Sequence, residues 1–169
     1  MKQSTYTYLL FILLGMITAC DTHREYDIEY TPIAPLGGQY RIYVYNQQGE
    51  ELLKDYCYIA NTSGYDPDQC WIRIGEYNEN PENPWAINGK ITCEISTLTF
   101  SGNEIENLAG NVTSSPETFT LMNGRLLLNE ATTPSGATAD SIHFSFHNSR
   151  FPGELFTAQG YRYKGWNGD

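Results

Sequence analysis

A serine and a histidine close together in the chain are the first residues that could do hydrolytic chemistry. Ser141 and His143 stand in a segment with strand-like alternation, where two residues span about 7 Å. A serine hydrolase also needs its nucleophile on a sharp turn beside an oxyanion hole, and the sequence has no G-x-S-x-G segment. Ser135, which follows Pro134, is better explained as part of a turn. We therefore expect no catalytic residue and keep an esterase-like hydrolase as the second alternative function.

Metal chemistry is disfavoured by the spacing of the candidate ligands. His143 and His147 resemble the HxxxH pattern of a helical metal site, but four residues of a strand span about 13 Å, too far for both imidazoles to hold one ion. The cysteines form no CxxC pair and have no histidine at ligand spacing. Asp66 and Asp68 are better explained as caps of a turn, and nothing resembles a phosphate-binding loop. The sequence predicts neither a metal nor another cofactor.

Cys20 has the setting of a cysteine that becomes acylated. A short apolar run, residues 9–17, is followed by small residues and then the cysteine, which is the layout of a bacterial secretory signal. Residues 17–20 also resemble a lipobox, the site at which a lipoprotein signal peptide is cut before its cysteine. The cysteine then becomes the new N-terminus and is acylated. We predict a signal peptide over residues 1–19, lipidation at Cys20 and a charged, proline-containing tether over residues 20–37. The protein would then be anchored at the outer membrane or the cell surface.

Secretion would place the other cysteines in a compartment where disulfides persist. Cys57 and Cys70 can face each other if the segment around Asp66 turns a hairpin between them. Our first expectation is a Cys57–Cys70 disulfide, with Cys93 free and buried. A Cys57–Cys93 disulfide and three buried thiols remain open as alternatives.

Composition and charge limit both the fold and the partners. The chain has 169 residues, enough for one domain, and 10 Lys and Arg against 20 Asp and Glu give a formal net charge of -10. Nucleic acid is an unfavourable partner because phosphate contacts need Lys and Arg. Hydrophobic residues at 40% are enough for a core, and 13 Tyr, 15 Gly and 8 Pro favour strands and tight turns. We expect an acidic all-β domain over residues 38–169.

Short segments with period-2 alternation fill this domain, and no segment has a convincing helical period. Asn123-Gly124 between two such segments is a strong hairpin signal. Strands are expected at residues 40–45, 53–60, 69–77, 89–100, 105–112, 118–122, 125–129, 141–148 and 155–163. Parallel strands need long crossovers, which do not fit here, so the sheet must be antiparallel. Closure into a barrel removes exposed edges, and we predict an up-and-down β-barrel of about eight strands, with a two-sheet sandwich as the alternative.

The apolar positions of these strands form the predicted interior. An eight-stranded barrel is just wide enough to be filled by side chains or to hold one small ligand, so we expect most of these residues to be core and some to line a cavity. The interior set is Ile42, Val44, Ile59, Ile72, Ile74, Ile91, Cys93, Ile95, Leu126, Leu128, Ile142, Phe144 and Phe146. The ligand-binding candidates within it are Ile42, Val44, Ile72, Ile74, Ile95, Ile142, Phe144 and Phe146.

Several motifs carry a resemblance to a known family. They are Gly38-Gln39-Tyr40, Asp66-Pro67-Asp68 with Trp71, the segment ATTPSGATADSI at residues 131–142, and Gly160-Tyr161-Arg162. With these, most of residues 38–169 resembles the lipid-binding putative hydrolase family, small lipoproteins of Bacteroidetes with a calycin-like (lipocalin-like) barrel. The resemblance implies a secreted, lipid-anchored barrel that binds an apolar molecule. It brings no catalytic motif and no cysteine pattern.

The predicted function is therefore a membrane-anchored lipoprotein whose calycin-like barrel binds a lipid or similar apolar small molecule without catalysis. We expect a monomer whose partners are the membrane, through the N-terminal anchor, and the apolar ligand. The first alternative is a carbohydrate-binding or assembly module at the cell surface. In that case exposed tyrosines would stack on sugar rings, and the candidates are Tyr43, Tyr45, Tyr161 and Tyr163.

Overall fold

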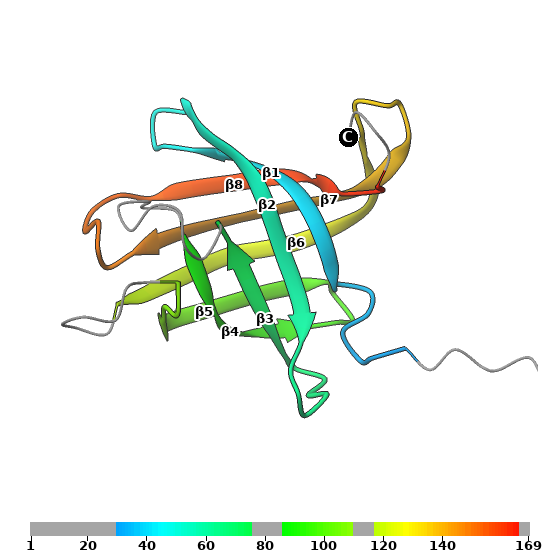
Figure 1. The fold of residues 1–169 in the computed structure, drawn as a ribbon, viewed down its shortest axis with the longest axis horizontal. Coiled ribbons are helices and arrows are strands. Elements are labelled where there is room, and N and C mark those ends of the chain that lie inside the picture. Colours follow the sequence, from blue (N-terminus) through cyan, green and yellow to red (C-terminus); the bar gives the residue numbers. More distant parts are fainter. Residues whose placement is uncertain (1–29, 76–85, 110–116, 166–169) are drawn as a thin grey trace, which may run out of the picture. The chain divides into compact units, whose positions relative to one another are not determined.

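The computed structural model describes residues 30–75, 86–109 and 117–165, and every regular element within them is a β-strand. The strands pair antiparallel in sequence order, and the last pairs with the first, so the sheet closes into an eight-stranded barrel, shown in Figure 1. They are β1 (Gly38–Tyr45), β2 (Glu51–Asn61), β3 (Gln69–Ile74), β4 (Ile87–Glu94), β5 (Thr99–Glu106), β6 (Thr118–Thr132), β7 (Thr138–Asn148) and β8 (Phe156–Arg162). The predicted antiparallel up-and-down barrel is confirmed, and the sandwich alternative is wrong.

Strand β1 shows why these sequences form a barrel wall. Tyr40, Ile42 and Val44 are completely buried, whereas Arg41 and Tyr43 between them stay partly exposed. Burial of every second side chain removes apolar area from water, while the intervening polar groups remain at the surface. The same alternation in the neighbouring strands gives the barrel one apolar interior and one polar exterior.

The predicted strand over residues 89–100 is wrong, because the chain reverses in the middle of it. β4 ends at Glu94, and β5 begins at Thr99 after a tight turn in which Leu98 has a φ of 54°. The Glu94 carboxylate accepts hydrogen bonds from the backbone N–H and the hydroxyl of Ser96, at 3.0 and 2.7 Å. This local capping supports a turn that contains none of the Gly, Pro or Asn residues that usually announce one.

The predicted hairpin at Asn123-Gly124 is also wrong, because β6 runs through it without reversing. A two-residue hairpin turn of the Asn-Gly type needs a positive φ at both central residues. Asn123 has a φ of 57°, but Gly124 is not among the glycines with a positive φ. The pairing of β6 shifts register here against both β5 and β7, so the dipeptide makes a β-bulge within one long strand.

All but two members of the predicted interior set are buried in one core, as expected. Leu128 is the clear exception, since 54% of its side chain is exposed. Asn129 next to it has a φ of 58°, and the pairing of β6 with β7 shifts register between Leu127 and Ala131. This second irregularity turns Leu128 out of the barrel. Ile95 lies in the turn after β4 and is only partly buried against the core.

One end of the barrel is closed by the segment before β1. Residues 31–37 form consecutive turns in which Ile33 and Leu36 are 1% and 0% exposed and join the core cluster. The expected tether over residues 20–37 is therefore wrong for its last part, because these apolar side chains are buried rather than solvated. The signal peptide, Cys20 and the start of the tether lie outside the described residues.

Arg162, the last residue of β8, holds this closing segment in place. Its guanidinium donates to Asp140 at 2.8 Å and lies 4.9 Å over the ring of Tyr40. It also donates to the backbone carbonyls of Gly37 and of Pro35, the latter at 2.7 Å. One cation thus joins β7, β8, β1 and the turns before β1, and we call this set of contacts the Arg162 clamp.

The predicted Cys57–Cys70 disulfide is not formed. Cys57, Cys70 and Cys93 are all free, buried thiols on the interior face. Cys57 lies opposite Ile74 and Cys70 opposite Asn61, so the two cysteines are not cross-strand partners. The expectation of one hairpin between them was right, but its register separates the sulfur atoms along the strands. The alternative of three buried thiols is the arrangement that the structure has.

We expect Arg162→Ala to lower the free energy of unfolding by about 2–3 kcal/mol, because it leaves the Asp140 carboxylate without its cation and two carbonyls without their donor. Lys164→Ala, which removes an exposed cation two positions later, should change it by less than about 0.5 kcal/mol. Urea unfolding followed by circular dichroism measures both. Equal effects of the two substitutions would show that the clamp does not stabilise the barrel.

Alkylation tests the state of the cysteines. In the unreduced, denatured protein, iodoacetamide should modify all three barrel cysteines, whereas a disulfide between any two would leave a single reactive thiol. In the folded protein the reaction should be slow at neutral pH and should accelerate as the pH rises, because burial raises the pKa of each thiol and only the thiolate reacts. Peptide mass spectrometry assigns each modified site.

Candidate functional site

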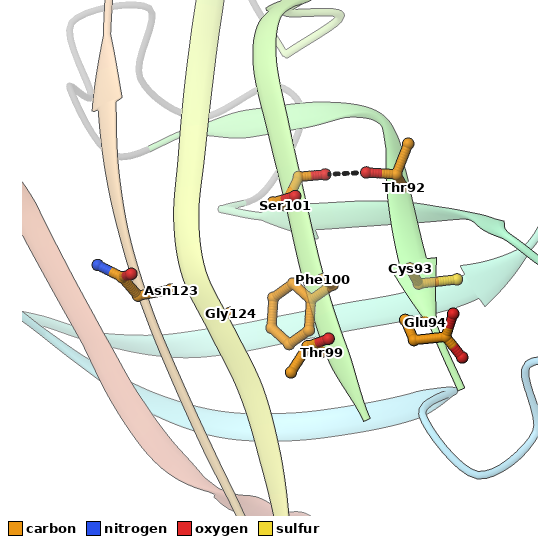
Figure 2. A pocket seen from close by; sticks show the side chains of 8 residues that line it. All are labelled: Thr92, Cys93, Glu94, Thr99, Phe100, Ser101, Asn123 and Gly124. Carbon is orange, nitrogen blue, oxygen red and sulfur yellow. Dashed lines mark hydrogen bonds between the residues drawn. The ribbon is translucent and has the colours of Figure 1, made fainter. Parts of the chain in front are cut away.

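The bulge in β6 leaves a hollow in the barrel wall, which we call the bulge pocket. It has a volume of about 400 Å³ and is lined by residues 92–94 of β4, residues 99–101 of β5, and Asn123 and Gly124 of β6 (Figure 2). Because β5 changes register against β6 between Phe100 and Gly102, the strands do not form a continuous ladder here. The volume lies within the range of roughly 300–1,000 Å³ that is common for small-molecule sites.

The floor of the bulge pocket belongs to the core. Phe100 and Cys93 are 3% and 7% exposed, and both are members of the core cluster. Gly124 permits this arrangement, since a Cβ there would collide with the carbonyl oxygen and the ring of Phe100. A ligand in the pocket therefore meets an aromatic ring and a thiol at the bottom rather than water-exposed backbone.

The rim of the pocket is polar and carries one negative charge. The Thr92 hydroxyl donates to the Ser101 carbonyl at 2.9 Å, and the Thr99 hydroxyl shares a hydrogen bond of 2.8 Å with Thr97. The side-chain and backbone hydrogen bonds from Ser96 lower the pKa of the Glu94 carboxyl, which is therefore ionised at neutral pH. This rim favours a ligand with an uncharged, hydrogen-bonding head over one with an anionic head.

The cysteine at the pocket floor is a poor nucleophile. Burial raises the pKa of the Cys93 thiol, and the neighbouring Asp68 and Glu94 carboxylates raise it further, although an interaction with Cys70 opposes them. A raised pKa means that the reactive thiolate is scarce at neutral pH. The pocket can thus bind a molecule, but none of its described groups is activated for attack.

The serine and histidine that suggested hydrolysis do not form a catalytic pair in the structure. Ser141 and His143 lie on the same face of β7, and no hydrogen bond joins them within the described residues. Burial and the positive charge of Arg125 lower the pKa of His143, while the backbone of Asn123 raises it. The described residues also contain no group of three or more His, Cys, Asp or Glu side chains able to hold a metal ion.

The predicted ligand-binding residues lie together in the middle of the barrel, where they pack against one another. All of them except Ile95 are 0% exposed. Phe144 and Phe146 belong to a row of rings that continues to Phe100 and Phe156, with centroid separations of 5.4–6.0 Å. None of the predicted residues lines the bulge pocket, and Phe100, which does, contacts Phe144 directly.

The bulge pocket was not predicted from the sequence. The feature of the sequence that points to it is Asn123-Gly124, because an Asn-Gly dipeptide within a continuous strand forms a bulge and interrupts the pairing. Two other depressions flank the turn between β1 and β2, and the interior residue that lines one of them is Phe156. The bulge pocket is the better candidate because two core side chains form its floor.

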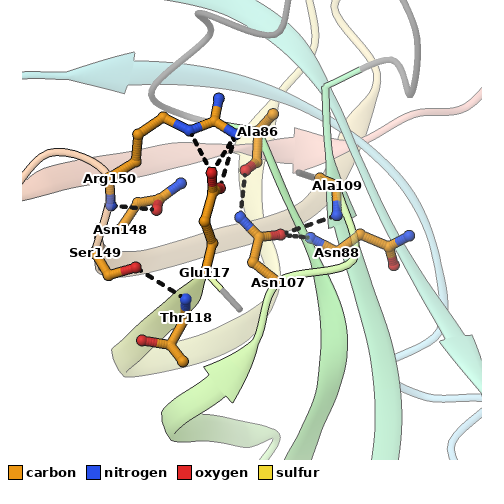
Figure 3. Close-up of polar contacts among 9 residues, drawn as sticks. All are labelled: Ala86, Asn88, Asn107, Ala109, Glu117, Thr118, Asn148, Ser149 and Arg150. Atoms are coloured by element: carbon orange, nitrogen blue, oxygen red, sulfur yellow. Dashed lines mark hydrogen bonds and ion pairs between the residues drawn. The ribbon is translucent and has the colours of Figure 1, made fainter. Parts of the chain in front are cut away.

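The other end of the barrel is held by polar contacts (Figure 3). Arg150, which follows β7, donates to both carboxylate oxygens of Glu117, the residue before β6, at 2.6 and 2.8 Å. Asn107 donates to the Ala86 carbonyl at 3.0 Å, and its side-chain oxygen accepts from the Asn88 backbone at 2.9 Å. These bonds connect the ends of β4 and β5 and the ends of β6 and β7. They stabilise the fold, so we do not interpret this polar cluster as a ligand site.

The tyrosines considered for sugar stacking are not an exposed set. Tyr161 is only 7% exposed, which corrects its assignment to the surface. Tyr43 and Tyr45 are half-buried on β1, and Tyr163 packs edge-on against Tyr56 with ring centroids 5.7 Å apart. Little free ring face remains for a stacked sugar.

Comparison with known proteins adds a family to this geometry. The part of the chain that the structure describes contains no helix that could span a bilayer. A search of curated proteins found no match to the chain. The sequence profile of the lipid-binding putative hydrolase family matches residues 25–167, which includes the whole barrel. The chain therefore belongs to the lipid-binding putative hydrolase family.

Proposed function

We propose that this protein is a lipid-anchored, calycin-like barrel that binds a lipid or similar apolar molecule and does not catalyse its hydrolysis. The observation that carries the proposal is membership of a lipid-binding family combined with a closed eight-stranded barrel. A barrel of this size either fills with side chains or holds one small ligand. Since the predicted ligand residues other than Ile95 are fully buried against one another, the ligand is better accommodated where the wall opens.

The bulge pocket supports this placement. The apolar part of the ligand would lie against Phe100 and Cys93, and its polar head would reach the hydroxyl, amide and carboxylate groups of the rim. The ionised Glu94 disfavours a fatty-acid anion, so the preferred ligands are lipids with a neutral head, such as acylglycerols or fatty alcohols. This goes beyond the family description, which does not specify a head group.

The non-catalytic part of the proposal is supported by the chemistry of the described side chains. Ser141 lacks a hydrogen bond to His143, and the thiol of Cys93 is kept protonated by its surroundings. The hydroxyls of Thr92 and Thr99 at the pocket rim are engaged in local hydrogen bonds. A hydrolase would need one of these groups to be deprotonated by a neighbouring base.

The proposed location is the outer membrane or the cell surface of a bacterium, with Cys20 as the anchor. The apolar run over residues 9–17 and the lipobox-like residues 17–20 support it. An anchor of two or more acyl chains gives stable membrane attachment, whereas a single chain gives marginal attachment.

Native mass spectrometry of the purified protein tests ligand binding. We expect a co-purifying neutral lipid, and we expect Ser101→Trp to weaken binding of a fluorescent acylglycerol by about tenfold or more, because the indole fills the pocket. Asn103→Trp adds the same side chain at an exposed position of β5 that does not line the pocket, and it should bind normally.

Two results would overturn this proposal. Ester turnover that disappears in Ser141→Ala would establish a hydrolase. A purified protein free of lipid that binds glycans, with no difference between the two tryptophan variants, would favour the carbohydrate-binding or assembly module.

Metabolic labelling with an alkyne-bearing fatty acid tests the anchor. The wild-type protein should incorporate the label, and Cys20→Ser should incorporate none, because the acylated sulfur is absent. Labelling that persists in Cys20→Ser would place the acyl group on another residue and contradict the proposed anchor.

A further inference from the structure

Positive charge is concentrated on one side of this acidic protein. Among the described residues, Arg150 and Arg162 are paired with Glu117 and Asp140. Of the other Lys and Arg side chains, those on the outward faces of adjacent strands β1 to β4 are Arg41, Lys54, Arg73 and Lys90. The whole chain has a formal net charge of -10, so this grouping is opposite in sign to the rest of the molecule.

Strand alternation places these cations outside the barrel. Arg41 lies between the buried Tyr40 and Ile42, and Arg73 lies between the buried Ile72 and Ile74. Lys54 and Lys90 are exposed positions of β2 and β4. The exposed carboxylates of the same strands, Glu51 and Glu94, stand at strand ends. The half-buried Asp55 lies in the middle of β2, but it is two residues from the buried Cys57 and so faces the interior side of the strand. The middle of the outward face is therefore cationic.

Each of these cations is matched with an aromatic ring on the neighbouring strand. Trp71 is the direct cross-strand partner of Lys90. The other cations lie over tyrosine rings at 4.4–4.9 Å from the centroid, and the pairs are Arg41 with Tyr56, Lys54 with Tyr43, and Arg73 with Tyr58. We call this surface of β1 to β4 the basic–aromatic face.

We propose that the basic–aromatic face docks on an anionic lipid surface. Tyr and Trp side chains favour the boundary between lipid and water, because each has an apolar body and a polar edge. Lys and Arg near an anionic membrane are attracted to its head groups. The rings hold the cations in defined positions, which reduces the side-chain freedom lost when the cations meet phosphate.

The rest of the molecule makes this docking directional. A protein of net charge -10 is repelled by an anionic membrane unless its positive side approaches first. Because β4 carries Lys90 and its residues 92–94 line the bulge pocket, docking would bring the pocket close to the lipid surface. The proposal does not depend on a lipid in the pocket, since it rests on charge and ring positions outside the barrel.

Vesicle sedimentation at low salt tests the proposal. The protein used begins at residue 21, which removes the proposed anchor and leaves intact the compact unit Thr31–Asp169. It should sediment with vesicles of equal parts of phosphatidylglycerol and phosphatidylcholine, and it should not sediment with phosphatidylcholine alone. High salt should release it, because screening weakens contacts between exposed charges.

Paired variants separate the face from net charge. Lys54→Gln with Lys90→Gln should weaken vesicle binding by about 25-fold, at roughly fivefold for each cation lost near an anionic surface. Arg125→Gln with Lys164→Gln makes the same change in net charge at exposed positions outside the face and should bind like the wild type. Each pair keeps the ring-stacked arginines and the core, and melting temperatures near that of the wild type confirm folding.

Equal losses in the two double variants, or equal sedimentation with neutral vesicles, would overturn the proposal. So would binding of the face to an acidic polysaccharide or to single-stranded nucleic acid with no sedimentation on anionic vesicles, because that result would assign the face to a different polyanion. Failure of the acylglycerol-binding test leaves these results unaffected, so the two proposals fail independently.

Discussion

The Arg162 clamp is the interaction on which the closed barrel depends. At one end of the barrel, the apolar interior meets the polar groups of the closing segment. The Arg162 guanidinium donates hydrogen bonds to the Asp140 carboxylate and to the backbone carbonyls of Gly37 and Pro35 there. The same guanidinium holds the turns before β1, which place Ile33 and Leu36 in the core. It therefore stabilises both this closed end of the barrel and the pairing of β1 with β8. Gly160 completes this closure, because a Cβ there would collide with the Arg41 carbonyl. Closure removes the exposed sheet edges that would otherwise pair with other chains.

The side chains fill the centre of the barrel, so the space for a small molecule lies in the barrel wall. The row of phenylalanine rings and the isoleucines around it are fully buried, so the alternating pattern serves packing first. The wall is regular wherever the alternation is unbroken, and the bulge at Asn123 opens it to the level of Phe100. In this protein the departure from regular pairing, rather than the apolar pattern itself, creates the bulge pocket.

Much of the fold was predictable from the sequence, and the errors have a common physical origin. Period-2 alternation identifies the face on which a residue lies, which is why Ile42, Ile72 and Phe144 were placed in the interior correctly. It does not identify register, and register decides whether Cys57 meets Cys70 and whether Asn123-Gly124 reverses the chain. The turn after Glu94 was missed because hydrogen bonds to its carboxylate, rather than Gly or Pro, support it. The bulge pocket and the Arg162 clamp depend on such three-dimensional contacts. Among their residues, Cys93, Asn123-Gly124, Tyr40 and Arg162 were therefore noted from the sequence only in other roles.

The charges on the barrel wall separate two kinds of selection that a lipid-binding protein needs. The ionised Glu94 lies at the rim of the bulge pocket, where it opposes an anionic head group, whereas the cations of the basic–aromatic face lie on the outward side of β1 to β4, where they favour an anionic surface. A single uniform charge could not do both, because a basic rim would attract the fatty acids and phospholipids of an anionic membrane. β4 contributes to both regions, since it carries Lys90 on the basic–aromatic face and Cys93 on the pocket floor, opposite Phe100 of β5. Docking as proposed would therefore place the lipid surface and the pocket on the same strand.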